Sequence, residues 1–109
     1  MPRNPPLEKR LEKYAAKEAK RRGIFAIKLQ VIGGPGWPDH TFFKDGRVGF
    51  IEYKRTEKSR FQPLQKYYIK LFRKLGFRAE VAWTQEQVDE FFAKFPSDLE
   101  PNEYDGQDL

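Results

Sequence analysis

The sequence predicts an α/β fold in which helices flank a mixed four-stranded sheet, with elements in the order α-β-β-β-α-β-α. Two observations lead to this prediction: three stretches place apolar residues at helical spacing, and four short stretches are rich in β-branched and aromatic residues. A chain of 109 residues is long enough for one small domain with one core, so we expect a single domain over residues 1–95.

The chain begins with a predicted helix and a predicted strand. Apolar side chains recur at helical spacing through residues 7–22, and Gly23 provides a stop signal. Residues 24–32, which read IFAIKLQVI, are rich in β-branched side chains and predict a strand. The next four residues, GGPG, break that strand before the following one begins.

Two strands joined by a tight turn come next. Residues 40–44 and 47–54 predict strands, and Asp45-Gly46 between them is the strongest short hairpin signal in the chain. The second of these strands carries apolar side chains on both of its faces. We therefore expect it to be covered on both faces and to lie in the centre of the sheet.

A helix, a strand and a last helix complete the domain. Pro63 suits the first turn of a helix that Gly76 ends, and this helix acts as the crossover to the fourth strand, residues 77–83. Its predicted buried stripe comprises Leu64, Tyr68, Leu71 and Leu75. Thr84 and Gln87 form a capping-box start for the last helix. The predicted apolar face of that helix comprises Val88, Phe91, Phe92 and Phe95.

The net charge of +5 is unevenly distributed along the chain. Residues 96–109 hold five acidic side chains and no basic one, and we expect them to form an acidic, flexible C-terminal tail. Residues 1–95 carry 21 basic against 11 acidic side chains, a net charge of +10. A body this basic suggests a polyanionic partner, and the alternative is a charged surface that serves solubility alone.

Composition also excludes several classes of protein and site. No stretch approaches the ~20 apolar residues of a membrane span, and MPRNPPLEKR at the start lacks the apolar core of a secretory signal. We therefore expect an intracellular, cytoplasmic protein (in the host cytoplasm if it is viral) with no membrane partner. The chain has no cysteine and His40 is its only histidine, so any metal must sit mainly on carboxylates and carbonyls, which favours Mg²⁺ or Mn²⁺.

Three charged residues around the hairpin are predicted to meet. A turn centred on Asp45-Gly46 places Asp39 opposite Glu52, and Lys54, two residues further along the strand, projects to the same face. Two carboxylates this close would repel each other, and a divalent cation between them would remove that cost and polarise a scissile phosphate. Lys54 would then orient or deprotonate the attacking water. Each residue also has an ordinary alternative explanation, as a turn residue or as an exposed ion pair at a strand end.

The order of these motifs resembles a known nuclease family. A Pro-Asp step followed by E-x-K on consecutive strands is typical of the PD-(D/E)xK superfamily, whose core is restriction-endonuclease-like. From about Glu8 to Phe92 the chain further resembles the virus-type replication-repair nuclease (VRR-NUC) domain. That family shows a G-x-P-D step and a hairpin, followed by an E-x-K strand, a basic loop and a P-x-Q helix start. In this chain the G-x-P-D step reads GWPD, the E-x-K strand IEYK, the basic loop RTEKSR and the helix start PLQ. The chain is thus similar to a stand-alone, minimal member of phage or bacterial type.

The resemblance implies roles for individual residues. The implied metal ligands are Asp39, Glu52, Glu8 and the backbone carbonyl of Tyr53. The family's first helix carries the glutamate that completes the site, and Glu12, one helical turn after Glu8, is the alternative to it. Lys54 would be the catalytic lysine, and Gln65 would be the helix glutamine that faces the active site. For Gln65 and both glutamates, the alternative is an ordinary solvated helix face.

The basic loop and the helix after it are predicted to contact DNA. The candidate residues are Arg55, Lys58, Arg60, Lys66 and Arg73, with Lys70 and Lys74 beside them. Contact of such a stripe with phosphates positions DNA without reading its sequence, although a solvated helix face is the alternative. Family members carry basic residues before the Pro-Asp step, whereas this chain reads GGPGW. Trp37 in that loop would stack on a base or pack into the core.

Together these observations predict a Mg²⁺- or Mn²⁺-dependent, structure-specific endodeoxyribonuclease. By the resemblance, its expected role is DNA repair or phage DNA processing by resolution of four-way (Holliday) junctions as a homodimer. A dimer suits that reaction because two symmetric cuts require two active sites related by a two-fold axis. The alternatives are a flap endonuclease or exonuclease that uses the same site, and a non-catalytic DNA-binding module.

Overall fold

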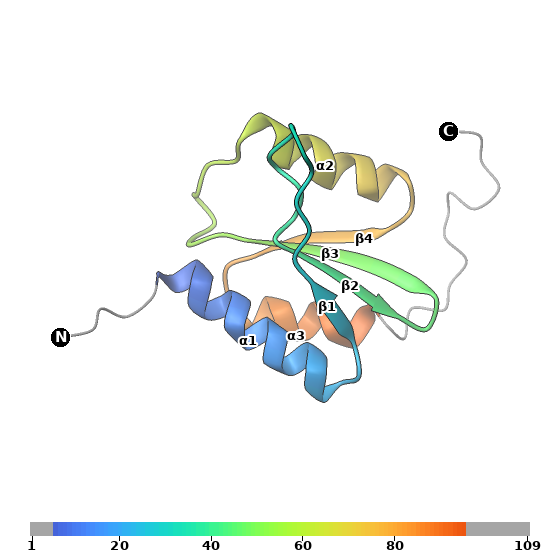
Figure 1. The fold of residues 1–109 in the computed structure, drawn as a ribbon. Coiled ribbons are helices and arrows are strands. Elements are labelled where there is room, and N and C mark those ends of the chain that lie inside the picture. Colours follow the sequence, from blue (N-terminus) through green and yellow to red (C-terminus); the bar gives the residue numbers. More distant parts are fainter. Residues whose placement is uncertain (1–5, 96–109) are drawn as a thin grey trace.

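Helices cover both faces of a sheet in the computed structural model of this protein, which describes residues 6–95 (Figure 1). The predicted acidic tail, residues 96–109, lies outside the described residues. The elements are α1 (Leu7–Arg21), β1 (Phe25–Ile27), β2 (His40–Lys44), β3 (Arg47–Tyr53), α2 (Pro63–Lys74), β4 (Arg78–Ala82) and α3 (Gln85–Lys94). Among residues 6–95, none of the helices is long and apolar enough to cross a membrane.

The sheet has the strand order β1-β2-β3-β4. The first three strands pair antiparallel, and β4 pairs with β3 in parallel because α2 crosses over between them. The fold class and the order of elements are therefore those that the sequence predicts. Helices α1 and α3 lie on one face of the sheet and α2 on the other, so β3 is central and covered on both faces, as predicted (Figure 1).

The hairpin between β2 and β3 has the predicted turn. Asp45 has a φ of 52° and Gly46 a φ of 76°, and positive φ at both central residues is what a type I′ turn requires. The register pairs Lys44 with Arg47 and His40 with Ile51. One further step along this register brings the residue before β2, Asp39, opposite Glu52, which is the arrangement that the sequence predicts.

Strand β1 is shorter than its sequence suggests. The predicted strand runs through Ile32, but β1 ends at Ile27, which pairs with Thr41 of β2. The reason is the length of the partner strand: β2 begins at His40, two residues after Pro38, which cannot donate a backbone hydrogen bond to a sheet. Residues 28–39 instead form a long connection that crosses toward α2 (Figure 1).

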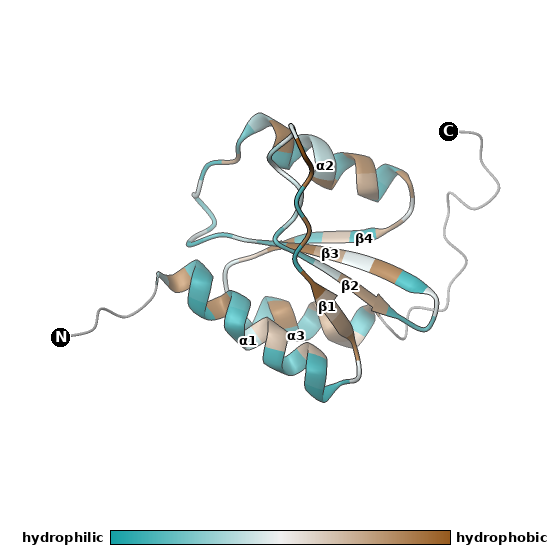
Figure 2. Cartoon of the chain, in the orientation of Figure 1, coloured by the Kyte–Doolittle hydropathy of each residue, from teal (hydrophilic) through white to brown (hydrophobic). Residues whose placement is uncertain are grey.

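The larger core lies between the sheet and the α1/α3 layer. Phe42 of β2, Ile51 of β3 and Phe92 of α3 are almost completely buried in it. The four residues predicted as the apolar face of the last helix are all buried there, and the Thr84–Gln87 capping box forms as predicted. The hydropathy colouring follows this division, because hydrophilic residues on α1 and α3 alternate with the apolar residues that pack inward (Figure 2).

The smaller core lies under α2, and its composition corrects one prediction. Phe50 of β3 packs against Ile69 and Phe72 of α2, and the Phe50 and Phe72 rings are stacked with centroids 4.0 Å apart. The predicted stripe of Leu64, Tyr68, Leu71 and Leu75 is wrong in detail, since Tyr68 packs only partly against this core and Leu64 is 38% exposed. The helix is turned so that Phe72 reaches the Phe50 ring, a tertiary contact that helical spacing alone does not specify.

Candidate active site

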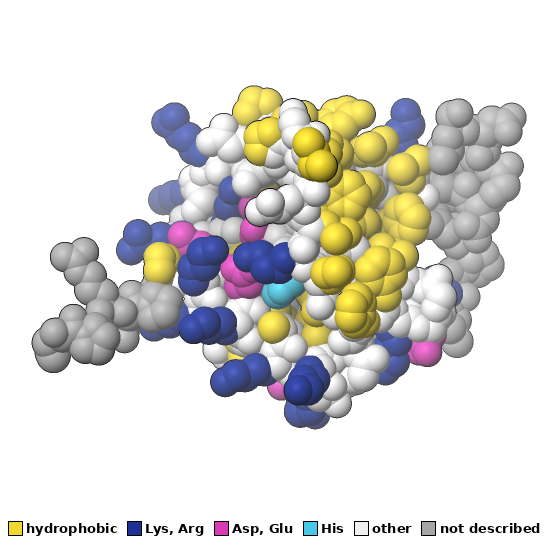
Figure 3. All heavy atoms as spheres, viewed as in Figure 1, with side chains coloured by type: hydrophobic (Ala, Val, Ile, Leu, Met, Phe, Trp, Pro, Cys, Tyr) yellow, Lys and Arg dark blue, Asp and Glu magenta, His cyan; other side chains and the backbone are white. Residues whose placement is uncertain are grey.

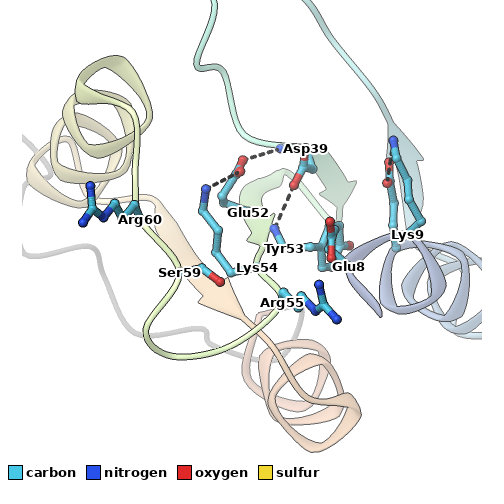
Figure 4. Close-up of a pocket in the computed structure, with 10 residues that line it drawn as sticks. Glu8, Lys9, Asp39, Glu52, Tyr53, Lys54, Arg55, Ser59 and Arg60 are labelled. Atoms are coloured by element: carbon cyan, nitrogen blue, oxygen red, sulfur yellow. Dashed lines mark hydrogen bonds and ion pairs between the residues drawn. The ribbon is translucent and has the colours of Figure 1, made fainter. Parts of the chain in front are cut away.

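A cavity of about 340 Å³ opens where β3 ends, between the start of α1 and the loop that leads to α2. Its lining includes the predicted site residues Glu8, Asp39, Glu52, Tyr53 and Lys54, which come from the first turn of α1, the residue before β2 and the end of β3 (Figure 4). The alternative residue Glu12 also lines it. The fold thus brings together in one cavity the carboxylates and the lysine that the sequence singled out.

The hairpin register holds the two central acidic residues together. The Asp39 backbone N–H donates to Glu52 Oε1 at 3.2 Å, and the Tyr53 N–H donates to Asp39 Oδ2 at 2.8 Å (Figure 4). Glu52 is only 4% exposed, although it is a charged residue. The Tyr53 ring is buried in the larger core, where its hydroxyl forms a 2.7 Å hydrogen bond with His40 Nδ1. This buried side chain anchors Tyr53, which also lines the cavity.

Gln65 connects the lysine with the buried glutamate. Its Nε2 donates to Glu52 Oε2 at 3.0 Å, while its Oε1 accepts from Lys54 Nζ at 2.8 Å. Lys54 Nζ also lies 3.6 Å from Glu52 Oε2. The Gln65 amide, on the first turn of α2, therefore points toward Glu52 and Lys54. The resemblance implied the same orientation, with the helix glutamine facing the active site.

The electrostatics of the pair disfavour two charged carboxylates. Burial, assisted by the neighbouring Asp39 carboxylate, raises the pKa of Glu52 to about 7, against the opposing effect of the Lys54 ammonium. Burial likewise raises the pKa of Asp39, although the Tyr53 N–H stabilises its charged form. Both shifts act in the direction expected of carboxyl groups that are buried and lie close to each other.

The two glutamates of α1 differ in their partners. Glu12 forms ion pairs with Lys28, in the connection after β1, and with Lys9 of its own helix. The contact with Glu12 raises the pKa of Lys28. Glu8 Oε2 and Glu12 Oε1 are both buried without a hydrogen-bond partner, but Glu12 Oε1 is engaged by the ion pair with Lys28. Since buried carboxylate oxygens are normally paired, Glu8 is the α1 residue with an oxygen free for a ligand in the cavity.

The donor set of the cavity is suited to a hard divalent cation. It consists of carboxylate oxygens, and Glu8 contributes one buried oxygen that no protein group satisfies. Within the described part of the chain, no three His, Cys, Asp or Glu side chains already converge as a ready metal site. Both Glu52 oxygens are instead engaged, one by the Asp39 N–H and one by the Gln65 amide. The residues present therefore fit such an ion in chemical type.

The predicted DNA-contacting residues divide into two groups. Arg55 and Arg60 line the cavity, and Lys58 and Lys66 are exposed nearby on the loop and the first turn of α2. Lys and Arg side chains surround the small acidic patch at the cavity on this face of the molecule (Figure 3). Arg73 lies near the other end of α2, where its Nε donates to the Ala79 carbonyl at 2.7 Å and its Nη2 contacts Glu80. Arg73 therefore ties α2 to β4, and it does not line the cavity.

Trp37 packs into the core, which was the second of the two positions predicted for it; the first was stacking on a base. Its ring packs against Phe50, Tyr68 and Phe72, with centroid distances of 5.0 to 5.8 Å. Its indole Nε1 donates to Thr41 Oγ1 at 3.0 Å. The aromatic surface is thus used within the smaller core, where it anchors the connection that leads to Asp39, and we do not include Trp37 among the DNA-contacting residues.

Four residues at the site were not singled out from the sequence. Lys28 pairs with Glu12, Lys9 and Ser59 line the cavity, and the Phe61 ring lies beneath the Lys54 ammonium, with its centroid 4.7 Å from Lys54 Nζ. Lys28 has a weak signal, because it is a single cation within an apolar stretch. Ser59 and Phe61 have none, since only the path of the loop between β3 and α2 brings them to the cavity.

Comparisons with known proteins identify the family. No family model matches the chain, and no curated protein matches it. Among solved structures, the chain is similar to one described as a VRR_NUC domain, with a TM-score of 0.74 and 30% sequence identity. The match covers 82% of this chain and 97% of that domain. The chain therefore belongs to the VRR-NUC family and is a nuclease domain.

Proposed function

We propose that this domain is a metal-dependent, structure-specific DNA endonuclease that resolves four-way junctions as a homodimer. One observation carries the catalytic part of the proposal. Asp39 and Glu52 are joined across the hairpin in the same cavity in which Lys54 is held 2.8 Å from Gln65 and 3.6 Å from Glu52. A buried acidic pair beside a fixed lysine supplies residue types that can hold a divalent cation and orient water for phosphodiester hydrolysis.

Each residue of the cavity has a part in the proposed reaction. Asp39, Glu52, Glu8 and the backbone carbonyl of Tyr53 would hold Mg²⁺ or Mn²⁺, which when bound supplies positive charge and polarises the scissile phosphate. The Lys54 ammonium orients the attacking water and offsets the negative charge that develops on the phosphate oxygens. Gln65 fixes Lys54 through its Oε1 and Glu52 through its Nε2, so both keep their orientation before DNA arrives.

The rim of the cavity would bind the DNA backbone. Arg55 and Arg60 line the cavity itself, while Lys58 and Lys66 lie exposed on the adjoining loop and helix. Cations in these positions reach phosphates on either side of the scissile bond and carry no information about base sequence. Such a rim is consistent with an enzyme that recognises the shape of branched DNA.

A cleavage assay over a panel of DNA structures tests the proposed substrate. With Mg²⁺ or Mn²⁺ present, we expect paired, symmetric nicks in a four-way junction and little cleavage of plain duplex, splayed-arm, flap or single-stranded DNA. Mapping the products on all strands measures this directly. Preferential cleavage of flaps, or processive trimming from ends, would replace the junction assignment with one of the two other nuclease activities, and no cleavage of any substrate would leave a DNA-binding module.

Exposed apolar residues supply a candidate surface for the second protomer. We define the apolar band as the five residues Phe25, Leu29, Val31, Ile32 and Phe43. Phe25 of β1 and Phe43 of β2 lie on the same face of the sheet as α2. That helix covers this face at β3 and β4 but leaves it open at β1 and β2 (Figure 1, Figure 3). Ile32 is fully exposed and Phe25 is 60% exposed, and exposed apolar surface of this kind is typical of protein interfaces. Strand β1 is also an edge of the sheet, free to pair with another strand.

Charged substitutions in the apolar band should convert a dimer into monomers. We expect the parent protein to sediment as a dimer at micromolar concentration, and an Ile32→Asp/Phe25→Asp double variant to sediment as a monomer with unchanged circular dichroism. Ala16→Asp, which adds a charge to an exposed position of α1, is the control and should remain dimeric. A parent protein that is monomeric throughout, or a double variant that remains dimeric, would contradict this assignment of the interface.

A further inference from the structure

The loop between β3 and α2 delivers an aromatic ring to the Lys54 ammonium. Lys54 Nζ lies 4.7 Å from the centroid of the Phe61 ring. This is within the ~6 Å over which the negative face of an aromatic ring attracts a cation. Phe61 belongs to neither hydrophobic core, and among residues 6–95 no other aromatic ring is paired with it. Packing of the core therefore does not account for a phenylalanine at this position.

Phe61 completes the surroundings of the ammonium group. The amide oxygen of Gln65 lies 2.8 Å from Lys54 Nζ and Glu52 Oε2 lies 3.6 Å from it, so two groups already hold the ammonium by polar contacts. The ring provides a third, apolar contact. The Lys54 side chain is only 13% exposed as a result, although a lysine has a long, flexible stem and is usually well hydrated.

The position of the ring is fixed by the start of α2. Gln65 Oε1 accepts a second hydrogen bond, from the backbone N–H of Gln62 at 2.9 Å. Gln62 follows Phe61 directly and precedes Pro63, whose ring restricts the backbone at the first helical position. One amide oxygen therefore holds both the lysine and the peptide that carries the ring, so ring and ammonium are located relative to the same atom.

We propose that Phe61 is a positioning residue for the catalytic step, and that its ring face holds the Lys54 ammonium toward Glu52 and the cavity. The proposal rests on the proposed catalytic role of Lys54. Without the ring, the lysine stem gains rotamers that point away from Glu52, and water reaches the ammonium from the side that the ring now covers. The effect is therefore on the rate of cleavage and leaves DNA affinity unchanged, because Phe61 itself meets no phosphate in the reaction.

Fluorination of the Phe61 ring tests the proposal, since it weakens the negative ring face while the size of the ring hardly changes. With mono-, di- and trifluorinated phenylalanine at this position, we expect the single-turnover cleavage rate to fall stepwise, by roughly 2- to 30-fold in all. Junction affinity should remain constant. Phe61→Leu should lose activity similarly, whereas Phe61→Trp should retain it. The same fluorinated series at Phe77, a partly exposed ring that packs edge-on against Phe50 and does not line the cavity, is the control and should leave the cleavage rate unchanged.

The outcomes separate this proposal from the proposed function. If Lys54→Ala cleaves normally, the catalytic role of Lys54 is wrong. If Lys54→Ala is inactive but the rate is the same across the fluorinated series, the lysine assignment stands and the role of Phe61 is overturned. A loss of rate with Phe61→Leu that fluorination does not reproduce would assign Phe61 a purely steric role, and would also overturn the proposal.

Discussion

Replacement of Asp39 by asparagine should abolish DNA cleavage and leave junction binding intact. The change keeps the shape of the side chain and an oxygen that can accept the Tyr53 N–H, so the hairpin should retain its structure. It removes one of the proposed metal ligands, and such groups stabilise the transition state by several kcal/mol, so the rate should fall on the order of a thousandfold or more. Single-turnover cleavage with Mn²⁺ and junction binding in Ca²⁺ measure the two effects separately.

Two further variants make this prediction sharper. Asp45→Asn produces the same chemical change at the tip of the hairpin, where asparagine tolerates the positive φ of 52°, and it should cleave normally. Lys54→Ala should also be inactive, because it removes the ammonium that Gln65 and Glu52 hold. Full activity of Asp39→Asn or of Lys54→Ala would refute the assignment of this cavity as the active site.

Gly36→Ala should disturb both the stability and the activity of the domain. Gly36 has a φ of +124°, and an added Cβ would lie 2.6 Å from Leu64 Cβ and 2.9 Å from the backbone N of Gln65. The connection that carries Asp39 thus touches the first turn of α2, which carries Gln65, at a point with no space for a side chain. We expect a loss of roughly 1–3 kcal/mol of unfolding free energy from backbone strain and collision. Cleavage should also be slower, because the connection that carries Asp39 and the helix turn that carries Gln65 must move apart to make room for the added methyl group. Urea unfolding and single-turnover rates measure these quantities.

Gly33→Ala is a matched control within the same connection. Gly33 also has a positive φ, +78°, but a Cβ there would meet nothing within 4 Å. This variant bears the backbone cost without the collision, so it should lose less stability and keep its cleavage rate. Equal losses in the two variants would mean that the contact between Gly36 and α2 does not support the site.

Features encoded locally could be predicted from the sequence. The Asp45-Gly46 turn and the alternating pattern of its strands specify the register, and the register alone brings Asp39 to Glu52. The capping box and apolar face of α3 are likewise local and were predicted correctly. These features depend on side chains a few residues apart, where turn chemistry and periodicity are sufficient.

Features that depend on distant partners could not be predicted in this way. The end of β1 is determined by the length of β2, and the buried side of α2 by the Phe50 ring. Arg73 resembles a phosphate-binding residue in the sequence, but the Ala79 carbonyl becomes its partner only once α2 packs beside β4. The cation–π contact of Phe61 depends in the same way on the course of the loop between β3 and α2, which no pattern in the sequence specifies.

The contacts within the site have a consequence for the order in which the protein folds. Asp39 and Glu52 are 13 residues apart, as are Glu52 and Gln65, while Lys54 and Gln65 are separated by 11. Contacts of such short range close with little loss of chain entropy, and they form early compared with contacts between distant segments. Glu8 must arrive from the far end of the chain. We therefore expect the hairpin and the start of α2 to assemble as one early unit, and the last acidic residue of the cavity to be added only when α1 docks.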